Sequence, residues 1–229
     1  MSKGDTFENN LLLHVFQNAT ITLIGDAAGL LASAAAGSLY VSLHTADPGE
    51  AGDQTTSETA YTNYARQAVA RSAGGWTVST NQVSNAAAIN FPACGLTGAT
   101  ITHFVVGTAS SGAGKLLYKG PLGTVVQGPF TAIAAGDLIT IPGHTLAVDE
   151  RVAFYPAFGS SLPTGITEGT IYWVKTVASN DITVSATQGG AAVDITAAGD
   201  GVAIEAATLA VSSGITPSFA IGALVVTED

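Results

Sequence analysis

The spacing of hydrophobic positions along the chain changes near residue 38. Upstream, Phe7, Leu11 and Val15 recur every four residues, the spacing that places side chains on one face of a helix. Downstream, "SLYVSLH" at 38–44 alternates apolar and polar positions, as a strand with one buried face does. The pattern predicts a short N-terminal helix followed by a β-rich chain.

The N-terminal stretch "GDTFENNLLLHVFQN" carries helix-start signals as well as helical spacing. Asp5 is expected to cap the first-turn amides, with Glu8 at the reciprocal capping-box position. The stripe of Phe7, Leu11 and Val15 packs either on the domain's own core, the favoured alternative, or against a partner. The following "GDAAGLLASAAAG" is compatible with a weak helix or an extended arm.

Further strand candidates follow at short intervals, separated by Gly, Pro, Asn or Ser. They are "GWTVS" at 75–79, "AAAINF" at 86–91, "ITHFVVGT" at 101–108 and "KLLYKG" at 115–120. This spacing is typical of an antiparallel sandwich or barrel. The sequence therefore predicts an all-β fold with one short helix.

Composition changes again near residue 124, where short strand-like pieces rich in Thr, Val and Ile begin. Residues 125–206 are expected to form a small β module of their own, and 207–229 to return to the first domain. Surface loops tolerate such insertions. The predicted organisation is a helix and arm at 1–37, a main β-sandwich domain at 38–124 plus 207–229, and an inserted β module at 125–206.

Charge excludes some partners. The 229 residues hold seven Lys or Arg and 17 Asp or Glu, a net charge of −10. Nucleic-acid binding needs a basic patch, so no nucleic-acid partner is expected. No apolar run approaches the ~20 residues of a membrane helix, and the N-terminus does not have the pattern of a signal peptide. Charged residues make up only 10%, which indicates a surface that is either largely polar and neutral or covered by neighbours, as in a densely packed assembly.

The acidic turn "TADPGEAGD" raises the question of a metal site. Asp47, Glu50 and Asp53 offer oxygen ligands to calcium, but the EF-hand order of acids and glycine is missing. A connecting loop is the favoured interpretation. "GAGKL" at 112–116 lacks the hydroxyl residue and the helix of a phosphate-binding loop, so a hairpin turn is expected there.

No catalytic, cofactor-binding or metal site is expected elsewhere. The four histidines, at 14, 44, 103 and 144, show no metal-binding spacing. The single cysteine, Cys94, excludes an intrachain disulfide and a multi-cysteine zinc site, and is expected to be a small buried residue rather than a nucleophile. We expect a protein that is not an enzyme.

Two cations, Arg66 and Arg71, stand among Tyr61, Tyr64 and Trp76. Arginine with aromatic neighbours is enriched at protein interfaces, because its planar group stacks and binds carboxylates in a bidentate way. An internal ion pair with one of the loop acids is an equally good account. The candidate interface residues are Phe7, Leu11, Val15, Arg66 and Arg71.

An ordered series of motifs resembles a group of tailed-bacteriophage structural proteins that are labelled tail-fibre proteins or capsid decoration (cement) proteins. The series is "LHTADPGEAG", "YARQAVARS", "GWTVS", "FPAC" and "GITPSFAIGAL", and the resemblance covers about 38–122 and 207–229. It implies a virion component without catalysis, made in the host cytoplasm. Similarity to cement proteins implies a jelly-roll-like sandwich that forms dimers or trimers and bridges major capsid protein subunits on the capsid exterior.

The cement interpretation is the main expectation, because no long shaft or repeat of a fibre is visible in the sequence. The alternative is a tail-fibre or host-binding adhesin component, which would contact the host surface. Under this alternative, aromatic residues of the 125–206 module would form an exposed patch, whereas otherwise they fill the module's own core. These residues are Phe154, Tyr155, Phe158, Tyr172 and Trp173.

Overall fold

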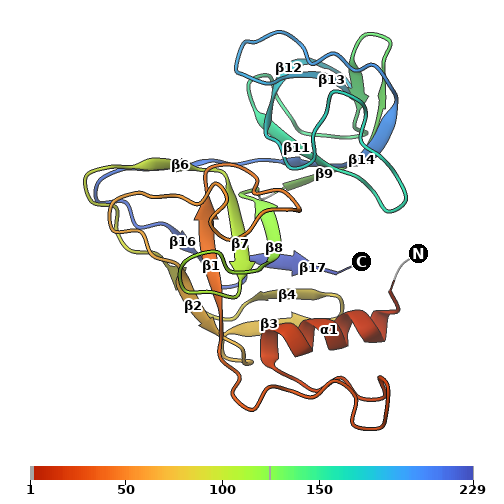
Figure 1. Ribbon diagram of the computed structural model, residues 1–229. Coiled ribbons are helices and arrows are strands. Elements are labelled where there is room, and N and C mark those ends of the chain that lie inside the picture. The colour runs from red at the N-terminus through yellow and green to blue at the C-terminus, as the bar shows by residue number, and fades with distance from the viewer. Residues whose placement is uncertain (1–2, 124, 229) are drawn as a thin grey trace. The chain divides into compact units, whose positions relative to one another are not determined.

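The computed structural model describes residues 3–123 and 125–228, and its regular secondary structure is mostly β-strand (Figure 1). The predicted all-β class is confirmed, with antiparallel pairing in every register that is defined. One helix, α1 (Asp5–Gln17), is present in the described chain. No helix of the described residues is long and apolar enough to cross a membrane.

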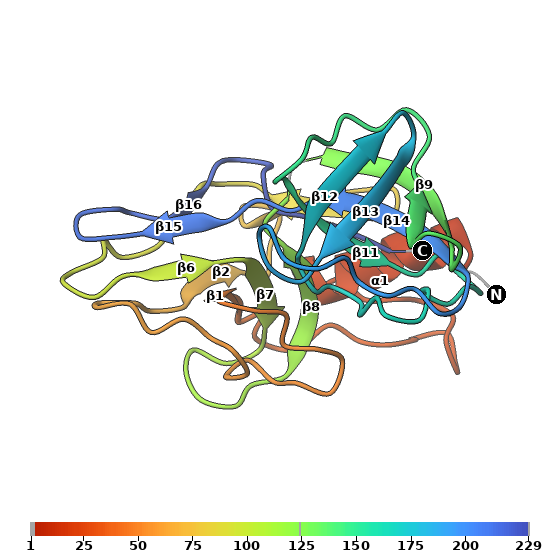
Figure 2. The same ribbon diagram turned by 90° about the horizontal axis from the view of Figure 1, so that it is seen from above.

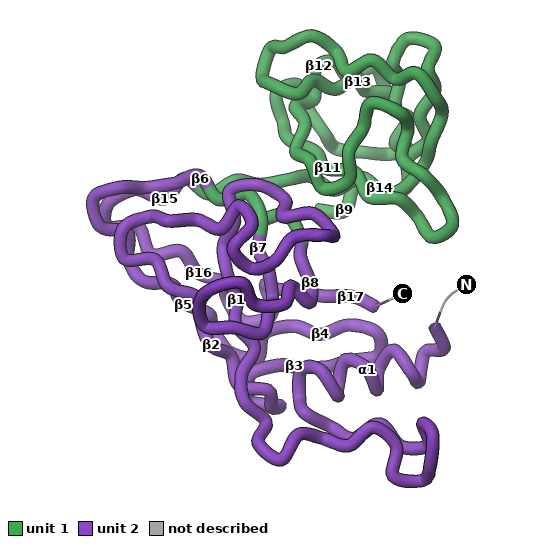
Figure 3. The backbone as a smooth tube through the Cα atoms, viewed as in Figure 1, with its two compact units in different colours: residues 1, 101–103, 120–209 green, residues 2–100, 104–119, 210–229 purple. Residues whose placement is uncertain are grey.

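The chain divides into two compact units, coloured separately in Figure 3. Unit 1 holds residues 101–103 and 120–209, and unit 2 holds the described residues of 2–100, 104–119 and 210–229. The predicted domain organisation is a helix and arm at 1–37, a main domain at 38–124 plus 207–229, and an inserted module at 125–206. It states which segments fold as domains of their own, and it stays a prediction.

Unit 2 contains small antiparallel sheets that join distant parts of the chain. A four-stranded sheet has the order β2-β1-β7-β8 and a three-stranded sheet the order β17-β4-β3; two pairs, β16-β5 and β15-β6, complete the set. The C-terminal strands therefore pair with the segment at 82–90. The bounds are β1 Ser38–His44, β2 Gln67–Ala70, β3 Trp76–Ser79, β4 Gln82–Asn85, β5 Ile89–Asn90, β6 Ala99–Ile101, β7 His103–Gly107, β8 Leu116–Pro121, β15 Leu209–Val211, β16 Ser218–Phe219 and β17 Val225–Thr227.

Unit 1 is built on a closed barrel with the strand order β10-β13-β12-β11-β14-β9. Figure 2 shows β12 and β13 side by side, joined by a tight turn in which Ser179 has a positive φ of 59°. Closure leaves the barrel without exposed sheet edges. The bounds are β9 Val125–Ile133, β10 Leu138–Thr140, β11 Arg151–Tyr155, β12 Tyr172–Ala178, β13 Asp181–Ser185 and β14 Gly199–Glu205.

Side chains from the barrel strands and from the loops between them form one hydrophobic core. Phe130 and Phe154 pack edge to face with ring centroids 5.0 Å apart, and Tyr172 lies 6.1 Å from Phe154. Such aromatic pairs add stabilisation to the area that they bury. The core contains Phe130, Ala132, Ile139, Ile141, Leu146, Val152, Phe154, Ile166, Tyr172, Val174, Ile182, Val184, Ile195 and Ala203.

Helix α1 forms where predicted, but a different row of its side chains is buried. Leu12 and Phe16 are fully buried, and the Phe16 ring packs edge to face on Trp76 at 4.8 Å. The predicted stripe lies one position earlier and is less buried, with Phe7 40% exposed. Because apolar residues occupy adjacent rows of this helix, four-residue spacing alone does not select the buried row.

The predicted cap at Asp5 is wrong. The N-cap is Gly4, which makes no side-chain hydrogen bond, and Asp5 is the first helical residue. The Gly4 carbonyl accepts hydrogen bonds from the N–H groups of Phe7 and Glu8 at 2.7 and 3.1 Å. Asp5 still lies in the first turn, where a carboxylate interacts favourably with the helix dipole.

Residues 18–37 form an extended arm rather than a helix. A β-bridge joins Ile21 to Leu30, and the turn between them is fastened by Asp26 Oδ1, which accepts hydrogen bonds from the N–H groups of Ala28 and Gly29. Most side chains of the arm are exposed, but Ile21 is buried. Of the two alternatives that the Ala/Gly composition allowed, the structure has the extended one.

Candidate functional site

The most developed polar arrangement of unit 2 surrounds Arg66, which is 9% exposed. Its Nε donates to Glu58 Oε1 at 2.7 Å and its Nη2 to Glu58 Oε2 at 2.8 Å, a bidentate ion pair. Nη1 donates to the carbonyl of Ala109 and Nη2 to that of Gly112, both at 2.9 Å. One guanidinium thus joins the 53–58 segment to the 108–115 loop. We call Arg66, Glu58, Tyr64, Gln54 and His44 the Arg66 cluster.

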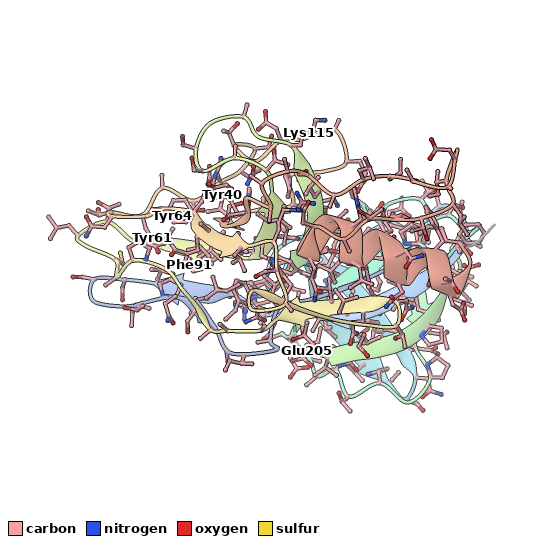
Figure 4. All side chains as sticks on the ribbon, turned by 90° about the horizontal axis from the view of Figure 1, so that it is seen from below. Tyr40, Tyr61, Tyr64, Phe91, Lys115 and Glu205 are labelled. Carbon is pink, nitrogen blue, oxygen red and sulfur yellow. The ribbon has the colours of Figure 1, made fainter. Side chains whose placement is uncertain are left out.

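Tyr64 extends the ion pair toward β1. Its hydroxyl donates to Glu58 Oε1 and accepts a hydrogen bond from the Leu43 N–H, both at 3.0 Å. Burial raises the pKa of Tyr64 far above its usual value, and the hydrogen bond to Glu58 raises the pKa of Arg66. The Tyr64 ring centroid lies 5.3 Å from that of Tyr61 and 6.2 Å from that of Phe91. Figure 4 labels the three residues, which gather in one part of unit 2.

Gln54 fixes the neighbouring loop through a close backbone approach. The side chain is fully buried, and its Oε1 accepts a hydrogen bond from the Ala109 N–H at 2.8 Å. A Cβ on Gly114 would lie 2.5 Å from the Ala109 Cβ and 2.2 Å from the same oxygen, so only glycine fits there. Thr108 and Lys115 close the loop with two further hydrogen bonds. "GAGKL" is therefore the turn that connects β7 to β8.

His44, the remaining member of the cluster, is fully buried. Its Nδ1 donates to the Thr56 carbonyl at 2.9 Å, and Nε2 lies 2.9 Å from the Ser42 hydroxyl. Because a carbonyl only accepts, Nδ1 carries the proton and Nε2 accepts from Ser42. Burial lowers the pKa of His44, which keeps the ring neutral near pH 7. These bonds hold the 53–58 segment on β1.

The acids of the opening turn support the loop itself. Asp47 accepts from the Gly49 N–H at 2.8 Å, and Asp53 accepts from the Thr55 N–H and hydroxyl at 2.7 and 2.6 Å. Lys119 lies 3.1 Å from Asp47 and 3.2 Å from Glu50. In the described part of the chain, no group of three or more His, Cys, Asp or Glu is placed to hold a metal ion. The loop is a connection between strands that its own hydrogen bonds and ion pairs hold in one conformation.

Arg71 fastens the end of helix α1. Its Nε donates to the carbonyl of Val15 and its Nη2 to that of His14, both at 2.6 Å, while Nη1 reaches the Ala36 carbonyl at 3.2 Å. The last carbonyls of a helix lack intrahelical partners and carry a partial negative charge. One cation at the end of β2 therefore binds both the helix and the base of the arm.

The candidate interface residues separate into two places. Val15 and Arg71 meet at the end of α1, with Phe7 and Leu11 on the same helix, whereas Arg66 lies in its own cluster. Arg66 takes the internal ion-pair alternative, although its partner is Glu58 rather than an acid of the opening turn. That these five residues contact a partner stays a prediction.

Sequence reasoning missed Gln54 and Glu58, which complete the cluster. Gln54 stands in the polar run "DQTTSE", where nothing in periodicity or composition distinguishes a buried amide from a solvated one. For Glu58 the sequence gives a weak indication of an ion pair, because this acid stands eight residues before an arginine that has aromatic neighbours. The spacing does not define the pair, because the chain between them is irregular.

The aromatic residues of the barrel are divided between core and surface. Phe154 and Tyr172 are buried, as the core alternative expects. Phe158, by contrast, is 64% exposed. Trp173 is half-buried, and the Arg151 guanidinium lies over its ring at 4.5 Å from the centroid. The five residues therefore do not form a single exposed patch.

The comparison with protein families identifies the class of protein. Residues 2–149 match the family of the Podophage GP4 fiber I protein gp80. The match covers more than half of the chain, and the chain belongs to this family, a family of bacteriophage virion structural proteins. The comparison with curated proteins finds no match. The phage virion part of the sequence resemblance is thus confirmed, and the family is one of fibres.

Proposed function

We propose that this protein is a tail-fibre component of a podophage virion that acts through binding rather than catalysis. The observation that carries the proposal is the family match over residues 2–149, which names a fibre protein. The expected role as a capsid cement protein, bridging major capsid protein subunits on the capsid exterior, draws no support from this match. The alternative of the sequence analysis is therefore the better supported one.

The geometry of the Arg66 cluster suits a structural role. Its ion pair and hydrogen bonds lie within the chain, between Glu58, Gln54, Ala109 and Gly112. Groups bound in this way keep two loops in one conformation, which a fibre component needs in order to present a constant surface. We assign the titratable groups of the cluster to loop positioning and expect no turnover of a substrate.

In this proposal the barrel of unit 1 supplies the contact with the host surface. Phe158 is the large aromatic residue of the barrel that is most exposed, and Trp173 with Arg151 adds a stacked pair. Aromatic and arginine side chains are the common anchors of protein interfaces. Phe158→Ala in the phage is expected to slow adsorption to host cells, with Phe154→Ala as the variant that instead disrupts the barrel core.

The location of the protein tests the proposal directly. Heads and tails are separated from purified virions, and copies of this chain per particle are counted by quantitative mass spectrometry. We expect a small number of copies, all in the tail fraction. Hundreds of copies on tail-less heads would overturn the fibre proposal and restore the cement role.

A further inference from the structure

A polar pocket lies where the first turns of α1 meet the turn between β3 and β4. Helix α1 runs along these two strands in unit 2, as Figure 1 shows. Asn9 Nδ2 on the helix donates to the Thr80 carbonyl in the turn at 2.8 Å. The pocket has a volume of about 580 Å³, and its lining side chains are all polar. They belong to Asp5, Thr6, Glu8, Asn9, Thr80 and Asn81.

Glu8 is the inward carboxylate of this pocket. It stands in the buried row of the helix, four residues before Leu12, and is only 5% exposed. Among the described residues, none donates a hydrogen bond to its side chain and no cation pairs with it. A nearly buried carboxylate without a partner is costly. The pocket is the side from which a partner can reach it.

The amide and hydroxyl groups around Glu8 have their donors bound elsewhere. Asn81 Nδ2 donates to the Glu228 carbonyl at 3.0 Å. The Thr80 hydroxyl donates to the Ser79 carbonyl at 2.7 Å and lies farther, 3.5 Å, from Asn81 Oδ1. Because a carbonyl only accepts, these bonds and that of Asn9 fix the orientation of both amides. The Oδ1 atoms of Asn9 and Asn81 therefore remain as acceptors.

The charge of the pocket is negative. Asp5 and Glu8 contribute two carboxylates, and none of the lining residues is basic. Lys3, which precedes the helix, pairs with Glu228 at 3.1 Å. The first amides of α1 carry only a partial positive charge, which two carboxylates outweigh. The pocket thus attracts a cation that brings several hydrogen-bond donors.

The donor set distinguishes between kinds of cation. A calcium ion takes about six to eight oxygen ligands close around one point, and the described residues place no group of three or more acids for a metal ion. A guanidinium instead carries N–H donors spread over a planar fork, which suits acceptors distributed over the walls of a wider pocket. Arginine is also the cation that is enriched at protein interfaces.

We propose that this pocket binds an arginine side chain of a partner protein. Glu8 and Asp5 bind the guanidinium through charge-assisted hydrogen bonds, and the Oδ1 atoms of Asn9 and Asn81 accept from its remaining N–H groups. The net charge of −10 favours the approach of a basic segment. This inference concerns a surface of unit 2 and does not depend on the fibre assignment.

An NMR titration of the ¹⁵N-labelled full chain tests the site. The probe is the capped tripeptide Gly-Arg-Gly, and capped Gly-Gln-Gly is the uncharged control. We expect the arginine peptide alone to shift the Asn9 side-chain amide signals and the N–H signals of Thr80 and Asn81. No shift at these positions would overturn the proposal. Calcium chloride that shifts them where the arginine peptide does not would overturn it in favour of a metal site.

Three variants, each lowering the negative charge by one, assign the binding to the pocket. Glu8→Gln should weaken peptide binding at least about tenfold, the effect of one charge-assisted hydrogen bond. Asp5→Asn, at an exposed position, should also weaken it and decides the matter if Glu8→Gln does not fold. Glu50→Gln removes an acid of the opening turn that is 81% exposed and should bind as the unmodified chain does. Equal binding by all folded variants, or equal weakening in Glu50→Gln, would contradict the site.

Discussion

Arg66 Nε lies 2.7 Å from Glu58 Oε1, and the two side chains are only 3% and 16% exposed. The pair joins the 53–58 segment to the 108–115 loop, because the same guanidinium donates to the carbonyls of Ala109 and Gly112. A buried ion pair adds little by itself, but removal of one partner leaves the other charge buried and unpaired.

Arg66→Met is therefore expected to lower the free energy of unfolding by about 3–5 kcal/mol. Urea denaturation followed by tryptophan fluorescence measures the loss. Arg66→Lys keeps the positive charge but cannot form the bidentate ion pair. Its free energy of unfolding should therefore lie between those of the unmodified protein and Arg66→Met. Glu58→Gln combined with Arg66→Met should cost less than the sum of the single changes, and additivity in this cycle would show that the pair is not coupled.

His44 predicts a pH dependence of stability. Burial holds the pKa of His44 in the folded chain below its usual value of 6.5, so protonation favours the unfolded state. Stability from this group is complete above pH 6.5 and is lost as the pH falls through the folded-state pKa. The unfolding free energy should fall between pH 7 and pH 5, and less steeply in His44→Gln. Parallel curves for the two proteins would rule out His44 as the source.

The buried row of helix α1 is tested by a pair of adjacent leucines. Leu12 is fully buried and Leu11 is half-buried. Leu12→Ala should destabilise the protein by about 2–5 kcal/mol, because the site cannot fully collapse around the missing atoms. Leu11→Ala should cost clearly less. Thermal unfolding of both variants gives the comparison, and the reverse order would restore the stripe predicted from spacing.

Arg71 is expected to stabilise the end of α1. Arg71→Ala removes two hydrogen bonds to helix carbonyls and a favourable charge at the helix C-terminus, a loss of about 1–2 kcal/mol. Hydrogen exchange should accelerate at 14–20 more than in the barrel. Arg71→Lys retains the charge and should recover part of the protection. Equal acceleration over the whole chain would indicate global rather than local destabilisation.

Local patterns determined several elements of this protein. Four-residue spacing in "GDTFENNLLLHVFQN" predicts a helix that the structure places at Asp5–Gln17, and alternation predicts a strand at 38–44, where the structure has β1. The outward positions that this alternation assigns to Ser42 and His44 are wrong, because both side chains are fully buried. The strands β2 and β4 were missed, because "QAVA" and "QVSN" are too short and too small in side-chain size to show a period. Periodicity reports on a segment's own faces, so it finds elements with one strongly buried face.

By itself, the sequence determined the all-β class, the short helix and the phage virion family, since each depends on periodicity or on an ordered series of motifs. Only the tertiary structure decided that Arg66 binds Glu58 and the Gly112 carbonyl, that Leu12 rather than Leu11 is buried, and that Arg71 binds the last carbonyls of α1. These outcomes depend on which distant segments pack together. Contacts between distant segments form only in the folded chain. The hydrophobic periodicity of the sequence around one residue therefore does not predict them.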